Sequence, residues 1–373
     1  MSKVVITKAD TYDEQAVALA MHELLNQLGG ISKFIKPGDK VLLKPNMLEG
    51  LPPDKAVTTH PEIVRAMIRQ VKGAGGIPLV GDSPGVSSTL KAAEKCGILR
   101  VCQHEDVELI PFIDKVEVPF AQGSTVKKFV LAKAYIQVDK VISLAKMKTH
   151  SFMGVTGGVK NLFGLMVGTD KAQFHLRMKK RSDFAGMLVD LAQVIKPVLY
   201  IVDGIVGMEG HGPRNGKPKQ ANILLGGRNG FAVDLVMAEV MGYKGETMPV
   251  AAKALSLDLS PRMKDIEIVG SGSNIRLEFA KPRNLESLDN KLPAPVVDFF
   301  QNQLTAKPVI ADCCIACGRC AAHCPPEAIK MMDNKAVIDY KKCIRCYCCQ
   351  ELCPADAVKL QNGLLLKMIR RGK

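Results

Sequence analysis

The chain has 373 residues with a balanced share of apolar (47%) and charged (24%) side chains, so we expect two or three folded domains and no extended disorder. Its formal net charge of +14 favours an anionic ligand or an acidic partner protein. Aromatic residues are scarce (5%, with no Trp), which argues against the stacking surfaces of nucleic-acid-binding proteins, so a nucleic-acid partner is not expected.

Residues 1–270 alternate short apolar runs with amphipathic stretches. In chain order, strands are predicted at 4–6, 40–43, 77–80, 141–144, 198–202 and 223–225. Helices are predicted at 14–28, 61–71, 183–195 and 232–241. This alternation predicts an α/β fold, with a mostly parallel sheet covered by helices on both faces.

The pattern loosens after residue 270. Prolines interrupt a charged stretch at 271–305, which we interpret as a connecting segment with one helix at 296–304. Residues 306–362 hold most of the cysteines and predict a small second domain, and 363–373 form a basic tail. The expected organisation is therefore a domain at 1–270, a connection, the small domain and the tail.

The small domain contains an internal repeat. Residues 314–330 and 343–359 align without gaps at an offset of 29, with eight identities in seventeen positions. The first copy has the spacing C-x2-C-x2-C-x3-C-P, beginning at Cys314, and the second has the same spacing, beginning at Cys343. Three close cysteines suit a cubane cluster, because a short loop lets successive thiolates reach neighbouring irons.

Both copies resemble the bacterial two-cluster ferredoxin, an α+β domain with two 4Fe–4S clusters. In such a domain the fourth Cys of each run binds the other cluster. The resemblance implies that one cluster takes Cys314, Cys317, Cys320 and Cys353, and the other takes Cys343, Cys346, Cys349 and Cys324. A structural zinc site is the alternative, although zinc usually takes paired C-x2-C knuckles.

Other cysteines fall outside this spacing. Cys313 and Cys348 are expected to be buried neighbours of the clusters, and Cys96 and Cys102 to be core residues of the large domain. Because the chain opens without the apolar core of a signal peptide, its cysteines favour metal ligation in a cytoplasmic protein over disulfides. We expect an organism that keeps oxygen away from the clusters.

Gly, Pro and polar residues gather at the predicted strand ends, where open α/β sheets bind ligands. These segments lie at 44–46, 58–61, 81–85, 146–150, 157–164, 203–204 and 208–213. Together they resemble the family catalogued as domain of unknown function 362, over roughly residues 40–245. His211 and Asn229 depart from the pattern of that family, and the resemblance implies no established activity.

The residues of these segments suggest an anion site. The glycines at 157, 158 and 164 would let backbone N–H groups approach a ligand, and Lys44, Lys146, Lys148 and Lys160 would add positive charge. Structural turns with solvated lysines are the alternative. The histidines and acids of the segments are candidate acid–base groups or ligands of a further metal: His60, His150, His175, His211, Asp82, Asp203, Glu209 and Asp234.

We therefore expect an iron–sulfur oxidoreductase whose clusters exchange low-potential electrons with a small anionic or polar substrate. Lys148, His150, Lys160 and His175 are the predicted catalytic residues, supplying charge stabilisation and protons in one cleft that opens towards a cluster. The alternatives are an electron carrier or redox sensor that docks a partner protein, and a metal-handling or assembly protein. The sequence leaves the oligomeric state open.

Overall fold

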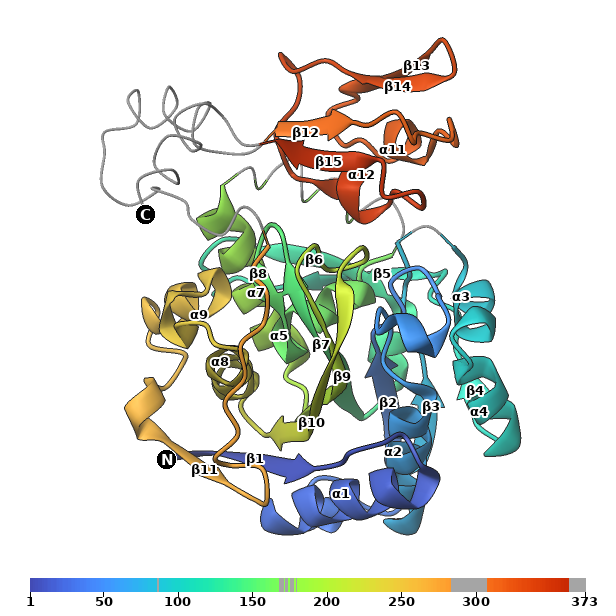
Figure 1. Ribbon diagram of the computed structural model, residues 1–373. Helices are drawn as coiled ribbons and strands as arrows, with labels where there is room; N and C mark the ends of the chain where they lie inside the picture. The colour runs from blue at the N-terminus through green and yellow to red at the C-terminus, as the bar shows by residue number, and fades with distance from the viewer. Residues whose placement is uncertain are drawn as a thin grey trace.

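A computed structural model describes residues 1–85, 87–167, 171, 174, 178, 180–282 and 307–361. The predicted helix at 296–304 and the tail at 363–373 lie outside these ranges, as does His175. Figure 1 shows the chain as a large domain with a smaller one, drawn in orange and red, seated on it.

The large domain is built on a nine-stranded sheet in the order β11-β1-β10-β9-β7-β2-β3-β4, with β8 paired to β7. The pairs β2–β3, β2–β7, β7–β9, β3–β4 and β1–β11 are parallel. Antiparallel pairs join β10 to both β1 and β9. The strands are β1 (Ser2–Lys8), β2 (Lys40–Pro45), β3 (Ile77–Val80), β4 (Glu108–Leu109), β7 (Lys140–His150), β8 (Gly154–Thr156), β9 (Leu199–Glu209), β10 (Lys217–Gly227) and β11 (Ile266–Val269).

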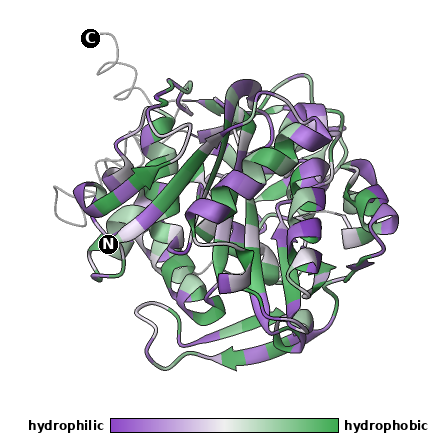
Figure 2. Cartoon of the chain, turned by 90° about the horizontal axis from the view of Figure 1, so that it is seen from below, coloured by the Kyte–Doolittle hydropathy of each residue, from purple (hydrophilic) through white to green (hydrophobic). Residues whose placement is uncertain are grey.

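Helices cover both faces of this sheet, because successive strand residues point to opposite sides. In β2, Val41 and Leu43 join one hydrophobic core and Leu42 joins the other. Figure 2 shows the strands between helices that carry purple, hydrophilic segments. One face carries α1 (Glu14–Gln27), α2 (Pro61–Gly73), α3 (Thr89–Lys95) and α4 (Ile98–His104); the other carries α5 (Gly158–Asn161), α7 (Arg181–Ile195), α8 (Gly230–Val240) and α9 (Pro249–Leu255).

The predicted α/β class and its strand–helix alternation are confirmed. Several strands are longer than predicted: β7 continues to His150, β9 continues to Glu209, and β10 begins at Lys217. The segment 146–150, expected as a loop, is therefore strand, because β8 folds back and pairs with it. The sequence analysis also missed α3, α4 and a hairpin, β5 (Lys115–Pro119) with β6 (Lys128–Ala132).

The large domain extends past residue 270. Backbone N–H groups of Leu277 and Phe279 donate to the carbonyls of Val240 and Met241, and the Phe279 ring is buried in the core. The first part of the predicted connection thus packs on the large domain.

The small domain consists of two antiparallel strand pairs and two short helices. β12 (Lys307–Ile310) pairs with β15 (Val358–Gln361), and β13 (Ile329–Met332) pairs with β14 (Lys335–Ile338). The helices are α11 (Arg319–Ala322) and α12 (Cys348–Glu351). In Figure 1 this domain lies above the upper end of the sheet, with α12 on the side of the large domain.

Across the described ranges we find no helix that has both the length and the apolar character needed to cross a membrane.

Candidate functional site

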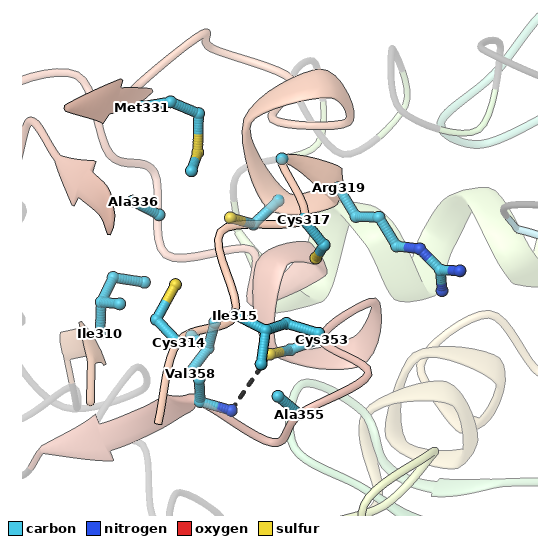
Figure 3. A pocket seen from close by; sticks show the side chains of 13 residues that line it. Ile310, Cys314, Ile315, Cys317, Arg319, Met331, Ala336, Cys353, Ala355 and Val358 are labelled. Carbon is cyan, nitrogen blue, oxygen red and sulfur yellow. Dashed lines mark hydrogen bonds between the residues drawn. The ribbon is translucent and has the colours of Figure 1, made fainter. Parts of the chain in front are cut away.

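Two hollows in the small domain are lined by cysteines. Figure 3 shows the first, with the side chains of Cys314, Cys317 and Cys353 arranged around it. Cys320 completes its cysteine lining. The second hollow is lined by Cys324, Cys343, Cys346 and Cys349, with Cys348 beside them. The fourth cysteine of each run thus reaches the hollow of the other run.

The backbone repeats the sequence symmetry. Left-handed residues occur at equivalent places of the two copies, at Ala316 (φ 51) and Arg345 (φ 53), and again at Gly318 (φ 70) and Tyr347 (φ 62). The backbone N–H of Ala328 donates to Cys324 Sγ at 3.2 Å, and that of Ala357 to Cys353 Sγ at 3.1 Å. Such N–H···S contacts stabilise thiolates that bind a cluster.

These linings fit cubane clusters better than single ions. Within the described residues no group of three or more His, Cys, Asp or Glu converges closely enough to hold one metal ion. Four sulfurs around an apolar hollow are instead what a cluster needs, since each iron takes one thiolate. The donor set and its spread argue against the zinc alternative.

The two cysteines outside the ferredoxin spacing differ. The expected burial is wrong for Cys313, which is exposed, and confirmed for Cys348, which is buried next to Cys346. Because Cys348 also borders the second hollow, geometry alone does not separate it from a ligand, and its bystander role stays a prediction. Cys96 and Cys102 are buried in the core of the large domain.

Lysines are buried at the carboxyl ends of the strands of the large domain, beneath the small domain. Lys44 ends in a 2.7 Å ion pair with Asp82, and Lys146 in a 2.8 Å pair with Asp203. Lys148 is just as buried, but its ammonium donates to neutral acceptors, Asn46 Oδ1 (2.8 Å) and Val57 O (2.7 Å).

Three of the four predicted catalytic residues influence one another electrostatically: Lys148 and His150 from β7, and Lys160 from α5. Burial lowers the pKa of Lys148 well below its usual range, and the positive charge of Lys160 lowers it further. Burial and the same Lys160 charge lower the pKa of His150 to about 4. Lys148, His150 and Lys160 are therefore electrostatic neighbours, while His175 lies outside the described residues.

His150 is held in one tautomer. Its Nδ1 accepts hydrogen bonds from the backbone N–H groups of Phe152 (3.0 Å) and Met153 (3.1 Å). The neutral ring therefore carries its proton on Nε2, which lies 3.1 Å from Glu351 Oε1 of the small domain. Glu351 stands between Cys349 and Cys353, so this contact joins the lysine site to the cluster-binding loops.

Further contacts fix the small domain on this end of the sheet. Glu49 accepts both Arg214 (2.5 and 3.0 Å) and Arg319 (2.8 Å), and Arg214 also donates to the carbonyl of Cys353 (2.9 Å). The Tyr347 ring, at the left-handed position where the first copy has Gly318, is buried in the core of the large domain. The two domains thus meet at residues of both hollows, Arg319 and Cys353 of the first and Tyr347 of the second.

The expectation that the glycine loop presents free N–H groups to a ligand is wrong. The N–H groups of Gly158 (2.6 Å) and Val159 (3.0 Å) donate to the Asp234 carboxylate, from α8. A Cβ at Gly157 would lie 2.1 Å from Asp234 Oδ1, and one at Gly164 would lie 2.1 Å from Asp82 Oδ1. These glycines therefore allow close packing around internal carboxylates.

Several other candidates have structural contacts. His60 Nδ1 caps α2. Asp203 accepts hydrogen bonds from the Tyr12 hydroxyl (2.7 Å) and from Lys146. Glu209 accepts a hydrogen bond from the backbone N–H of Ala280 (2.9 Å) and forms an ion pair with Lys219. Asn229, noted as a departure from the family pattern, caps α8 through its side chain. His211 is half-buried in the turn after β9.

Sequence reasoning missed the domain-crossing groups Glu49, Arg214 and Glu351. Glu351 carried a signal, since it is an acid between two predicted cluster ligands. Glu49 and Arg214 carried none, because their partners are distant in sequence.

The comparisons with known proteins agree with this geometry. A family model described as "Domain of unknown function (DUF362)" matches residues 41–239, more than half of the chain. The chain belongs to this family. In this DUF362 protein a second match, described as "4Fe-4S dicluster domain", covers residues 307–354. The small domain is thus a 4Fe–4S ferredoxin-like module, and the fusion indicates iron–sulfur electron transfer.

Two individual proteins are similar to this DUF362 chain. "Thylakoid-associated protein sll1697" of Synechocystis sp. is 35% identical over 295 residues, covering 79% of this chain and 88% of that protein. The lactate racemase apoprotein from Thermoanaerobacterium thermosaccharolyticum aligns in structure over 61% of this chain, at a TM-score of 0.40 and 14% identity. This chain spans about half (54%) of that racemase chain, and the likeness carries no functional argument.

Proposed function

We propose that this protein is an iron–sulfur oxidoreductase in which two 4Fe–4S clusters exchange low-potential electrons with a small anionic substrate at the strand ends. The observation that carries the proposal is the contact of Glu351, between two cluster-binding cysteines, with His150 at the end of β7. Lys148 and Lys160 act electrostatically on the same histidine. Positive charge, a fixed imidazole and the module therefore meet at one place.

The chain's own residues would divide the work. Lys148 and Lys160 hold the anion and stabilise negative charge that develops on it during reduction. His150 keeps its proton on Nε2, orients Glu351, and excludes water from the domain boundary. His175 remains a predicted proton donor. The clusters, each held by the four cysteines named above, would supply or accept single electrons.

The two hollows suggest an order for electron transfer. The second lies at the domain boundary, since Tyr347 and Cys348 on its rim are buried and Cys348 is electrostatically coupled to Lys160. The first has an outward side, where Cys317 is exposed and Ile315 is 63% exposed, and a side at the large domain, where Arg319 contacts Glu49 and the Cys353 carbonyl contacts Arg214. Electrons would pass between a partner protein and the first cluster, and between the second cluster and the substrate.

A second candidate function, an electron carrier without its own chemistry, has one observation in its favour. The small domain carries exposed apolar side chains, of which Ile315 and Met331 line the first hollow and Met332 and Val337 lie on the β13–β14 hairpin. Such a surface suits a transient redox partner. The oxidoreductase function accounts for this surface as the place where a partner protein delivers electrons. The electron-carrier function does not account for the buried lysines.

Single-turnover reoxidation tests the proposal. Protein prepared without oxygen is reduced with dithionite, freed of excess reductant, and mixed with small phosphates and carboxylates that carry a reducible keto or alkene group, while the cluster absorbance near about 400 nm is followed. We expect one class of anion to restore the absorbance with saturable kinetics, and Lys148→Met to weaken this effect while the exposed Lys91→Met does not. If only protein acceptors reoxidise the clusters, the carrier function holds instead.

A further inference from the structure

The short helix α12 connects the two cluster sites and lies against the large domain. It contains Cys349, a predicted ligand of the second cluster, and leads to Cys353, a predicted ligand of the first. Asn215 Nδ2 of the large domain donates to the Gln350 carbonyl (3.3 Å), and Arg214 Nη1 donates to the Cys353 carbonyl (2.9 Å). A charged side chain of the large domain therefore contacts a predicted ligand of the first cluster.

Arg214 lies in the turn between β9 and β10, and its side chain is only 8% exposed. Its Nε and Nη2 donate to the two oxygens of Glu49, at 2.5 and 3.0 Å. Its Nη1 donates to Asn215 Oδ1 (3.0 Å) as well as to the Cys353 carbonyl. Because the guanidinium is planar and all three of its nitrogens have partners, its charge is held in one position relative to the cluster-binding loop.

Glu49 is shared between this arginine and the module. Its Oε1 also accepts a hydrogen bond from Arg319 Nη1 at 2.8 Å, and its side chain is 10% exposed. Arg319 precedes Cys320 and lines the first hollow, and Figure 3 shows its guanidinium extending away from the cysteine sulfurs. Since the Arg319 side chain is 38% exposed, water screens its charge more than it screens the charges of Glu49 and Arg214. The two buried charges of this group are therefore Arg214 and Glu49.

Fixed charges beside a cluster change how readily it accepts an electron. When a 4Fe–4S core with four thiolates takes up one electron, its charge changes from about −2 to about −3. A nearby cation favours the reduced form and a nearby anion disfavours it, most of all where water is excluded. We infer that the large domain sets the reduction potential of the first cluster, which Arg214 raises and Glu49 lowers. The inference rests on the clusters of the proposed function and involves no substrate.

The arginine contact breaks the internal symmetry of the module. In the first copy of the repeat, the Cys324 carbonyl accepts the backbone N–H of Glu327 at 2.9 Å. In the second copy, the equivalent N–H of Asp356 lies 3.4 Å from the Cys353 carbonyl, whose shorter contact is with Arg214 at 2.9 Å. Two sites of nearly identical sequence therefore have different electrostatic surroundings, which gives their clusters unequal potentials. Arg214 acts through Cys353, so it is a positioning residue for electron transfer.

A redox titration of the holoprotein tests this inference. Dithionite is added under nitrogen as the electron donor, and the reduced clusters are followed by electron paramagnetic resonance. Arg214→Met should lower one of the two potentials, and Glu49→Gln should raise the same one. Each variant should change the ratio of reduced to oxidised cluster roughly tenfold, which corresponds to about 59 mV for one electron. Arg214→Lys, which keeps the charge, should stay close to the wild type. Arg262→Met, which breaks the exposed pair with Glu246, should leave both potentials unchanged.

The opposite signs separate an electrostatic effect from simple attachment of the module. Loss of either residue breaks the same contact, so a weakened attachment would shift the potential in the same direction in both variants. Shifts of the same sign, or unchanged potentials, would overturn the inference. If Glu49→Gln does not retain its clusters, the two Arg214 variants decide, because only an electrostatic effect makes Arg214→Lys differ from Arg214→Met.

The affected cluster is identified with Cys317→Ser, which removes a predicted ligand of the first cluster. The reduction step that is missing in this variant should be the step that shifts in Arg214→Met, and a shift of the other step would contradict the inference. Reoxidation by an anion plays no part in this titration, so its failure would count against the proposed function alone.

Discussion

At the scale of single residues, the cysteines beside the cluster ligands give the first prediction. Cys346 and Cys348 both border the second hollow, but the spacing makes only Cys346 a ligand. Cys346→Ser should therefore lose about half of an expected total of about eight irons per chain, and Cys317→Ser likewise, because each removes one cluster's ligand.

The matched controls are Cys348→Ser and Cys313→Ser, which should keep both clusters. Iron and acid-labile sulfide are measured on protein purified without oxygen. Equal loss of iron from Cys346→Ser and Cys348→Ser would show that the ligand assignment in the second hollow is wrong.

Asp234 gives a pH dependence. Burial raises its carboxyl pKa to about 7 from an ordinary 3.8, against the opposing effect of hydrogen bonds from Val159 and Gly158. The folded protein therefore holds this proton more tightly than the unfolded chain does. The contribution to stability is fully present below about pH 4 and is lost as the pH rises through about 7.

Asp234→Asn should remove that dependence. We expect the free energy of unfolding of the wild type, relative to that of Asp234→Asn, to fall between pH 5.5 and 8. This range covers roughly the upper half of the interval over which the Asp234 carboxyl loses its proton. Urea midpoints of both proteins measure it, with the exposed Asp10→Asn as the control for loss of a carboxyl. A wild-type advantage that stays constant over this range would contradict the assignment.

At the scale of elements, the absence of a side chain at Gly164 leaves room for the buried ion pair of Lys44 and Asp82. A Cβ there would lie 2.1 Å from Asp82 Oδ1 and 2.5 Å from Lys44 Nζ. Gly164→Ala should destabilise the protein by about 1–3 kcal/mol, since neither buried ion can move away without losing its partner. Gly73→Ala, at the end of α2 with open space around it, should be neutral or slightly stabilising in the same unfolding measurement.

The sequence predicted the secondary-structure elements better than it predicted the contacts between side chains. Periodicity located β2, β3, α2 and α7, because each buries one or two faces in the hydrophobic cores on the two sides of the sheet. It stopped β7 at residue 144, because Lys146, Lys148 and His150 look like surface residues, although all three are buried. Their burial depends on partners such as Asp203, Asn46 and Glu351, which no local pattern reveals.

The glycine segment was misjudged for the same reason. Gly157 and Gly158 predicted an open anion loop, and the carboxylate that fills it comes from α8, far along the chain. The cysteine repeat, by contrast, was fully visible in the sequence, because cluster geometry constrains spacing within one short stretch.

At the scale of the whole molecule, ion pairs at Glu49 help to hold the ferredoxin-like module on the large domain. Glu49 joins Arg214 of the large domain to Arg319 of the module, and the Glu49 and Arg214 side chains are about nine-tenths buried (10% and 8% exposed). Burial alone would raise the pKa of the Glu49 carboxyl. Hydrogen bonds from Arg214 and Arg319 outweigh that effect, so the pKa is lowered. Removing Glu49 would leave the buried Arg214 charge without its carboxylate, which costs about 3–5 kcal/mol, and removing Arg214 would leave Glu49 with the half-exposed Arg319 alone.

Arg214→Met should therefore weaken the attachment of the module to the large domain without removing its clusters. We expect faster amide hydrogen exchange in α12 and unchanged iron content, because the cysteines are untouched. Arg262→Met, which breaks the exposed pair with Glu246, is the control. Exchange in α12 that matches the wild type would mean that other contacts hold the module.

The most direct measurement asks whether the bound anion lies beside a reduced cluster. Holoprotein is reduced, saturated with ³¹P-methyl phosphate or ¹³C-malonate, whichever binds, and examined by pulsed electron paramagnetic resonance. We predict a hyperfine coupling between the label and the cluster spin, lost in Lys148→Met and retained in Lys91→Met. A saturated anion without any such coupling would contradict the central claim, because the anion would then bind away from the clusters.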